Sequence, residues 1–372
     1  MRKRIFLLFM ISLLFIKTAA QEKEVDSLFD QSTGTFLPIP LIINNPTIET
    51  GFGGVGMYFF KFDKEDMVSP PSLVNLYAIY STNKSYILLA SARMYWNEDK
   101  NRATLIAGPI RINHDFIYEN DEGEDLHLVY SELRSIVTAE YSRKIFGDFY
   151  LGAMYLGTKT EFKFDKGTDE ENEFTEEFFR ANDITDNFIS SIGLNFSFDN
   201  RNYVYNPTKG LMFSIRPKLN REWLGSDNDY VDTDFTAVYF IPLSINQVLG
   251  FSLSGGIATG DVPFDGYQSY GLRNNLRGYP VGKYRGKNMA ALQAEYRRNI
   301  YNRWGAVAFA GTGSVWGNDD NGEEAFERTW LPSIGLGIRY MVSKEKRINL
   351  RLDFAMGVDG NQGVYFGIME AF

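Results

Sequence analysis

One cation and one anion in the C-terminal third of the sequence could form a strong ion pair. Arg277 lies in a glycine-rich segment, and Glu295 lies in a stretch where polar and apolar residues alternate. A guanidinium and a carboxylate bind each other through directional hydrogen bonds, which are strong where water is excluded. Gly278 lets the backbone turn where a side chain would clash. We therefore predict a loop that folds inward and pairs Arg277 with Glu295.

The residues around Glu295 predict a β-strand that would position it. Polar and apolar residues alternate there with a period of two, which places them on opposite faces of a strand. The polar set is Gln293, Glu295 and Arg297, and the apolar set is Ala290, Leu292, Ala294 and Tyr296. A second strand follows after a short turn. If both strands belong to a barrel with a polar interior, Glu295 faces the lumen.

The segment Leu276-Arg277-Gly278-Tyr279 resembles the lid-loop motif of BamA/TamA-type outer-membrane assembly barrels. That family, which includes two-partner-secretion transporters, carries (Val/Leu)-Arg-Gly-(Phe/Tyr) there and a glutamate in the next strand, which Glu295 matches. One position departs from the pattern. The family has Phe-x-Asp-x-Gly in the following strand, and Gly311 stands where that aspartate belongs. We therefore expect Arg277 to have at most one of its two usual partners and the lid to be held less firmly.

The N-terminal segment predicts export. Residues 1–20 combine Arg2-Lys3-Arg4, an apolar run and small residues before Gln21, which is the pattern of a signal peptide cleaved near Ala20. Residues 21–33 predict a short periplasmic leader. That leader has no room for the POTRA repeats that most of the resembling family carries, so we expect a POTRA-less member. The absence of cysteine excludes disulfides and thiolate sites.

Residues 34–372 predict one all-β domain, a 16-stranded antiparallel transmembrane β-barrel. Strands of about 10 residues that alternate in polarity and are separated by turn signals are typical of such barrels. Aromatic residues make up 15% of the chain. The predicted strands are 35–44, 50–62, 72–82, 84–96, 101–113, 129–143, 146–160, 187–199, 209–222, 230–243, 245–258, 287–299, 303–316, 330–342, 346–358 and 362–372. The long connections 114–128, 161–186, 259–286 and 317–329 are predicted to lie outside the cell.

The first and last predicted strands would meet at a seam. Pro38 and Pro40 lie two residues apart, so one edge of the first strand loses two hydrogen-bond donors. We infer a weakly hydrogen-bonded seam, which in the resembling family is the lateral gate for client strands; alternatively, the prolines only terminate a short strand. The last strand ends at Phe372, which we place at the seam. One face of the last strand is expected to form a lipid-facing row, made of Val364, Phe366, Ile368 and Phe372. Glu370 interrupts this row.

The sequence gives little indication of a catalytic, metal-binding or nucleic-acid-binding site. The two histidines are His114 and His127, and no G-x-S-x-G, H-E-x-x-H or P-loop motif is present. His114 followed by Asp115 is a minimal hint of a barrel phospholipase. The acidic clusters, including 121–125 and 169–171, lack EF-hand spacing and are predicted to be solvated loop tips. We therefore expect no enzyme activity, metal or cofactor, and the net charge of −9 disfavours a nucleic-acid partner.

Two functions remain open. The resemblance implies a barrel in the outer membrane of a Gram-negative bacterium that inserts, assembles or translocates proteins through the weak seam. Its partners would be outer-membrane lipid and unfolded outer-membrane protein clients. The alternative is a passive channel, or an accessory barrel that pairs through the seam with another outer-membrane component or with a second copy as a homodimer. The expected lack of POTRA repeats, the family's client-docking device, adds weight to the alternative, and the assembly role remains the first hypothesis.

Overall fold

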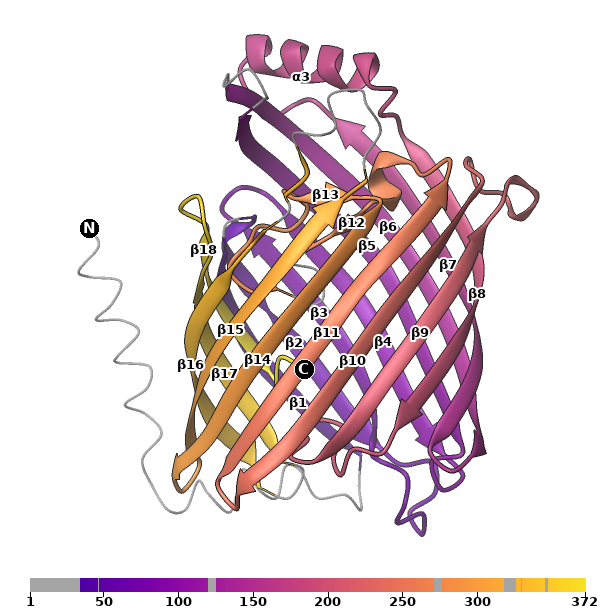
Figure 1. The fold of residues 1–372 in the computed structure, drawn as a ribbon, viewed down its shortest axis with the longest axis vertical. Coiled ribbons are helices and arrows are strands. Elements are labelled where there is room, and N and C mark those ends of the chain that lie inside the picture. Colours follow the sequence, from indigo (N-terminus) through magenta and orange to yellow (C-terminus); the bar gives the residue numbers. More distant parts are fainter. Residues whose placement is uncertain are drawn as a thin grey trace.

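Sixteen strands close into an antiparallel barrel (Figure 1). The computed structural model describes residues 34–45, 47–119, 125–270, 276–317, 326–328, 330–344 and 347–372. The predicted signal peptide and leader lie outside these residues. Within them, no helix is both long enough and apolar enough to cross a bilayer. The predicted fold class is confirmed.

The strands follow one another around the barrel in chain order. The neighbours β11 and β14 are joined by an insertion that carries the small sheet β12–β13, and β1 meets β18 to close the ring. The barrel strands are β1 (Thr35–Asn45), β2 (Glu49–Phe60), β3 (Ser72–Ser81), β4 (Tyr86–Trp96), β5 (Asn101–Glu119), β6 (Asp125–Phe146), β7 (Phe149–Lys163), β8 (Asn187–Asp199), β9 (Gly210–Asn220), β10 (Tyr230–Ser244), β11 (Gln247–Gly260), β14 (Asn288–Tyr301), β15 (Trp304–Trp316), β16 (Ser333–Ser343), β17 (Ile348–Met356) and β18 (Gln362–Ile368).

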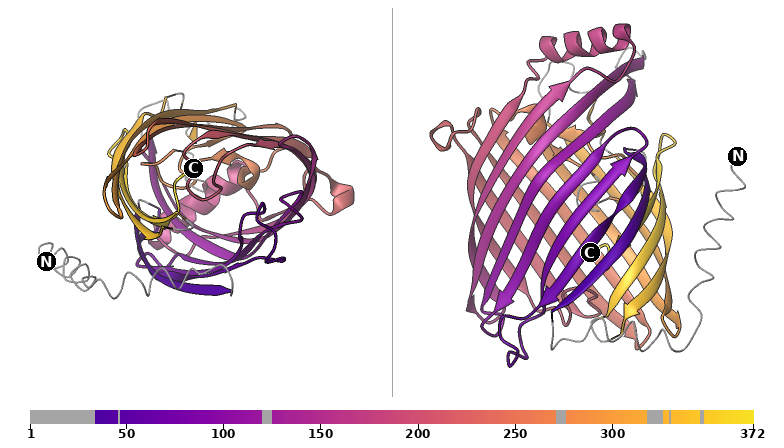
Figure 2. Two further views of the ribbon diagram at one scale, coloured as in Figure 1. Left: turned by 90° about the horizontal axis from the view of Figure 1, so that it is seen from below. Right: turned by 180° about the vertical axis from the view of Figure 1, so that it is seen from behind.

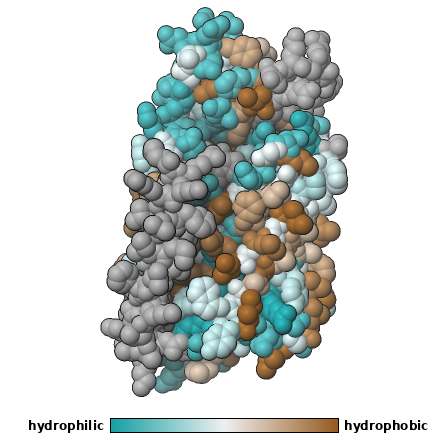
Figure 3. All heavy atoms as spheres, turned by 90° about the vertical axis from the view of Figure 1, so that its left-hand side faces the viewer, coloured by the Kyte–Doolittle hydropathy of each residue, from teal (hydrophilic) through white to brown (hydrophobic). Residues whose placement is uncertain are grey.

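The alternation of the sequence sorts side chains between lipid and lumen. Outward-facing residues such as Leu105, Val137 and Leu194 are exposed, whereas inward-facing residues such as Asn195 and Lys218 are buried. Apolar side chains gather on the barrel wall, and the end that carries the long hairpins is hydrophilic (Figure 3). A closed barrel pairs its backbone polar groups between strands, as the interior of a bilayer requires.

Two predicted outer loops are regular structure instead. Strands β5 and β6 continue through most of the predicted loop 114–128 and raise a long hairpin above the barrel. The predicted loop 161–186 contains helix α3 (Asp169–Ala181), which begins with a capping box between Thr168 and Glu171. The acidic cluster 169–171, predicted to be a loop tip, is the first turn of this helix, where negative charge is favourable. Seen from below, α3 crosses the opening of the barrel (Figure 2).

The last predicted strand is too long. Strand β18 ends at Ile368, Met369 has φ of 68°, and the following residues enter the lumen (Figure 2). The Glu370 side chain, only 2% exposed, is bound there by Arg339. A carboxylate on the lipid face is unfavourable, whereas lumenal guanidinium groups neutralise it. Phe372 is therefore neither at the seam nor in the lipid-facing row, because it packs inside the barrel against Phe240.

Backbone pairing is sparse at the seam. All eleven residues of β1 are in register with β2, whereas Asn44 with Val364 is the one register pair between β1 and β18 within the described chain. An unbroken antiparallel ladder accepts proline only where its nitrogen points away from the partner strand. Pro38 and Pro40 therefore direct their nitrogens, which carry no hydrogen, away from β2 and toward the seam.

Apolar side chains cover the seam where the backbone does not pair. Ile39 and Leu41 on the inner face of β1 belong to one buried cluster with Ile348 on the outer face of β17. Phe366 and Ile368 on the outer face of β18 pack against the same cluster. A buried cluster that combines the inner face of β1 with the outer faces of β17 and β18 indicates that the edges overlap. The seam is thus closed by hydrophobic burial more than by hydrogen bonds.

This geometry predicts where a disulfide can bridge the seam. Asn44→Cys with Val364→Cys should oxidise readily, because paired residues of antiparallel strands lie about 4.5–5.5 Å apart. The natural chain has no cysteine, so the pair is isolated. Continuing the same register would pair position 40 with position 368, and Pro40→Cys with Ile368→Cys should remain reduced. Migration on non-reducing gels measures both, and equal cross-linking of the two pairs would contradict the overlapped seam.

Candidate functional site

The predicted lid loop lies inside the barrel. The loop lies between β11 and β14 in the sequence. Its residues Leu276, Arg277 and Tyr279 are almost completely buried. Gly278 has φ of 109°, and a Cβ atom there would lie 3.0 Å from the backbone of Met356. This close approach and the left-handed conformation explain the glycine. The Gly278 amide donates to the hydroxyl of Tyr365 on β18 at 2.8 Å.

Arg277 is held by two carboxylates. Its Nη2 lies 2.6 Å from Oε2 of Glu295, and its Nη1 lies 2.7 Å from Oδ2 of Asp353 on β17. All three side chains have no exposed surface. The guanidinium also stacks on the ring of Phe309, 3.4 Å from its centre. Of the two usual partners Arg277 thus has only Glu295, as expected, but Asp353 supplies a second carboxylate that was not expected.

The space at Gly311 explains why no aspartate stands there. A Cβ atom at this position would lie 2.7 Å from Cγ of Gln293 and 3.2 Å from Cδ1 of Leu276. Gln293, the Leu292 carbonyl and the leucine of the lid motif together occupy the room that a side chain on β15 would need. The negative charge comes instead from β17, two strands further along the wall. The alternation of the predicted strand 346–358 puts Asp353 on a polar face with Arg347, Asn349 and Arg351, but nothing in the sequence indicates that this face meets the lid.

The two ion pairs of Arg277 belong to a closed ring of charges. The other oxygen of Glu295 accepts from Nε of Arg297 at 2.7 Å. Asp353 is bound by Arg339 at 2.5 Å, and Arg339 in turn lies 2.7 Å from Glu370. Glu370 lies 3.8 Å from Arg297 and completes the ring. Positive and negative groups alternate in the order Arg277, Glu295, Arg297, Glu370, Arg339 and Asp353.

Further contacts fasten the lid motif to the wall. The Tyr279 hydroxyl donates to the Pro332 carbonyl at 2.5 Å and accepts from the amide of Val358 at 3.2 Å. The Ser333 hydroxyl donates to the Arg277 carbonyl. Together with Glu295 on β14, Phe309 on β15 and Tyr365 on β18, these contacts join the lid to every strand from β14 to β18. We call the lid motif and the charge ring together the lid lock.

The histidines lie elsewhere. His114 is buried, with Nε2 3.2 Å from Oε2 of Glu132, and it faces the lumen and not the lipid. His127 contacts Asp115 at 2.8 Å above the barrel. The outer-face serine–histidine pair that a barrel phospholipase would need is not formed by either. In the described part of the chain, no three metal-ligating side chains lie close enough to hold an ion.

Comparison with known proteins identifies the family. The model of the Omp85 superfamily domain matches residues 79–372. The chain belongs to the Omp85 superfamily. Its barrels are bacterial outer-membrane proteins of the BamA/TamA type, involved in protein assembly or transport. The matched range contains the whole lid lock, whereas β1 and β2 precede it. A search of curated proteins finds no match.

Solved structures share the fold of this Omp85 barrel at low sequence identity. BamA from Haemophilus ducreyi lacking POTRA domains 1–3 is 14% identical, with a TM-score of 0.54 over 93% of this chain and 77% of that one. CdiB from Acinetobacter baumannii is 13% identical, with a TM-score of 0.57 over 90% of this chain. CdiB from Escherichia coli is 10% identical, with a TM-score of 0.57, over 94% of this chain and 69% of that one. The chain spans only 59% of the Acinetobacter CdiB.

The burial of the lid lock predicts a large effect of removing its central cation. Arg277→Met should lower the free energy of unfolding by about 3–5 kcal/mol, because it leaves buried carboxylates short of a partner. The free energy of unfolding of Arg277→Lys should lie between those of the wild type and Arg277→Met, since a lysine ammonium cannot bind both carboxylates with the geometry of a guanidinium. Urea titration followed by tryptophan fluorescence measures the change.

The matched control is the exposed pair on α3, Arg180 with Glu176, whose side chains are 73% and 53% exposed. Arg180→Ala should change stability by less than about 1 kcal/mol. Equal effects at Arg277 and Arg180 would contradict a buried lock.

The crowding at Gly311 predicts that restoring the family's aspartate is harmful here. Gly311→Asp should displace Leu276 and expose the lid to trypsin, because overpacking a filled space forces neighbours to move. Gly311→Asn, with the same shape and no charge, should do the same. Limited proteolysis followed by mass spectrometry locates the cuts. A Gly311→Asp lid that is better protected than the wild type would show that charge, and not space, decides this position.

Proposed function

We propose that this Omp85 barrel promotes the insertion and assembly, or the translocation, of proteins at the outer membrane through the seam between β1 and β18. The observation that carries the proposal is the seam itself, where one register pair joins two strands. An unpaired strand edge is a template for pairing with another chain. The clients that fit it are unfolded outer-membrane proteins, whose strands could take the place of β18.

The prolines of β1 make such an edge tolerable while it is unpaired. A backbone donor without a partner costs several kcal/mol in hydrocarbon. Pro38 and Pro40 remove two donors from the edge that faces the seam. The open edge therefore exposes fewer unsatisfied groups to lipid, which lowers the free energy of seam opening.

The lid lock supports the same proposal because it confines movement. Arg277, Tyr279 and their partners tie the lid to the strands from β14 to β18. These strands would stay in register while β1 separates from β18. Locking the lid and weakening the seam are complementary, since a barrel in which every strand pair loosened would lose its fold.

A passive channel is the competing function. The described residues leave little room for one, because the lid motif and Glu370 to Phe372 lie in the lumen. Helix α3 and a buried aromatic cluster that includes Phe179, Phe264 and Phe326 cover the outer end. An accessory barrel or a homodimer that uses the seam as an interface stays a further alternative.

The folding rate of a urea-denatured porin added to liposomes tests the proposal. The barrel in the liposomes should accelerate folding, and Arg277→Ala should weaken the acceleration. The oxidised Asn44→Cys, Val364→Cys variant should lose it and regain it on reduction, whereas reductant should not affect the cysteine-free wild type. A channel would instead conduct ions in planar bilayers whether or not the seam is cross-linked. Acceleration that persists across the cross-linked seam would contradict the proposed route.

A further inference from the structure

The residues after β18 leave the barrel wall and occupy the lumen near its periplasmic end. Their ladder with β17 ends at Ile368, after which the amide of Met369 donates to the Asn349 carbonyl at 2.7 Å. Met369 adopts a left-handed conformation that a side chain disfavours. The contacts made by Glu370 and Phe372 must offset that conformation.

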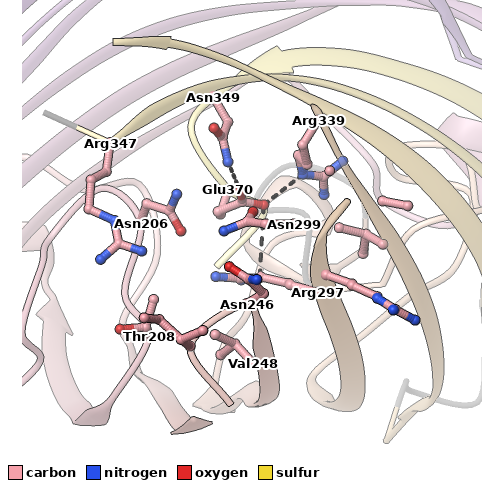
Figure 4. Close-up of a pocket in the computed structure, with 15 residues that line it drawn as sticks. Asn206, Thr208, Asn246, Val248, Arg297, Asn299, Arg339, Arg347, Asn349 and Glu370 are labelled. Atoms are coloured by element: carbon pink, nitrogen blue, oxygen red, sulfur yellow. Dashed lines mark hydrogen bonds and ion pairs between the residues drawn. The ribbon is translucent and has the colours of Figure 1, made fainter. Parts of the chain in front are cut away.

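Wall residues from several strands receive the Glu370 carboxylate. Nε of Arg339 on β16 donates to Oε2 at 2.7 Å, and Nδ2 of Asn349 on β17 donates to Oε1 at 2.6 Å. Arg297 on β14 lies 3.8 Å away. Figure 4 shows the carboxylate among these three side chains. All three belong to strands of the barrel wall.

A second part of the same site receives Phe372. Its ring stacks on Phe240 of β10, with centres 6.2 Å apart, and packs beside Val248. Arg297 donates from Nη2 to the Phe372 carbonyl at 2.7 Å and covers both rings. A Cβ atom at Gly250 would lie 3.3 Å from the Phe372 ring, so the glycine makes room for it. The site thus combines a carboxylate pocket and an aromatic pocket two residues apart.

Space and hydrogen-bonding groups continue beyond the bound residues. A small open cavity of about 30 Å³ adjoins Glu370. Amide side chains line it, at Asn206, Asn246, Asn299 and Asn349 (Figure 4). The Oδ1 atom of Asn349 is buried without a hydrogen-bond partner. Amide side chains both donate and accept hydrogen bonds, so these residues could hold the backbone of a peptide bound beside the two pockets.

We propose that this cavity is a peptide-binding site, selective for a carboxylate side chain two residues before an aromatic ring, which Glu370 and Phe372 fill as an internal ligand. A peptide of that pattern supplied by another chain would compete with them. The site lies inside the barrel and apart from the seam edge, although it shares Arg297, Arg339 and Glu370 with the lid lock. It goes beyond the function proposed above, and peptide binding and porin folding are measured separately.

Fluorescence anisotropy with a labelled peptide of sequence Ile-Met-Glu-Ala-Phe tests the proposal. A variant that stops after Met369 should bind the peptide saturably. The full chain should bind it at least about tenfold more weakly, because its own segment is present at a high effective concentration. Replacing glutamate by glutamine or phenylalanine by alanine in the peptide should each weaken binding by roughly tenfold.

Two further variants keep the test decisive. Gly250→Val in the shortened chain should block the aromatic pocket and abolish binding without altering any charge. If the shortened chain does not fold, as judged by heat-dependent migration on gels, Glu370→Gln with Phe372→Ala in the full chain empties the site instead. The proposal is overturned if the folded variant fails to bind, binds no better than the full chain, or binds a scrambled peptide equally well.

Discussion

The buried guanidinium of Arg277 is the constraint on which the C-terminal half of the barrel depends. A full charge without exposed surface is stable only beside opposite charge, and the attraction between such groups is strong in a medium of low dielectric constant. The two carboxylates come from β14 and β17, which are separated in the wall by β15 and β16. Any shift of β17 relative to β14 would lengthen one of the two ion pairs of Arg277. The lid thus fixes the register of four adjacent strands at once.

The weak seam contrasts with the strands from β14 to β18, which the lid holds together as a rigid block. Seven register pairs hold β18 to β17, whereas one holds it to β1. The lid adds the hydrogen bond from Gly278 to Tyr365, and the lumen adds the ion pair between Glu370 and Arg339. Strand β18 should therefore move together with β14 to β17, and β1 should move with β2. Movement concentrates at their junction because that is where the fewest backbone bonds must break.

Charge balance explains why the chain turns inward after β18. Four arginines meet in this part of the lumen, namely Arg277, Arg297, Arg339 and Arg351, and Glu295 and Asp353 are the carboxylates that the wall strands contribute to the ring. Glu370 supplies a third negative charge. Without it, two anions would face four buried cations, and like charges would destabilise the lumen. The same attraction that closes the ring removes Phe372 from the lipid face.

The sequence by itself determined the sixteen wall strands and which face most of their residues take. The period-two alternation was sufficient to count sixteen strands and to place Glu295 and Asp353 in the lumen, and Thr168 with Glu171 carried an unused signal for helix α3. The lid motif identified Arg277 as a lumenal cation. Only the tertiary structure decided that Asp353 is its second partner, that Leu276 fills the space at Gly311, and that Glu370 turns inward. Alternation fixes which side of the wall a residue faces, but closure and strand stagger decide which residues meet across the lumen.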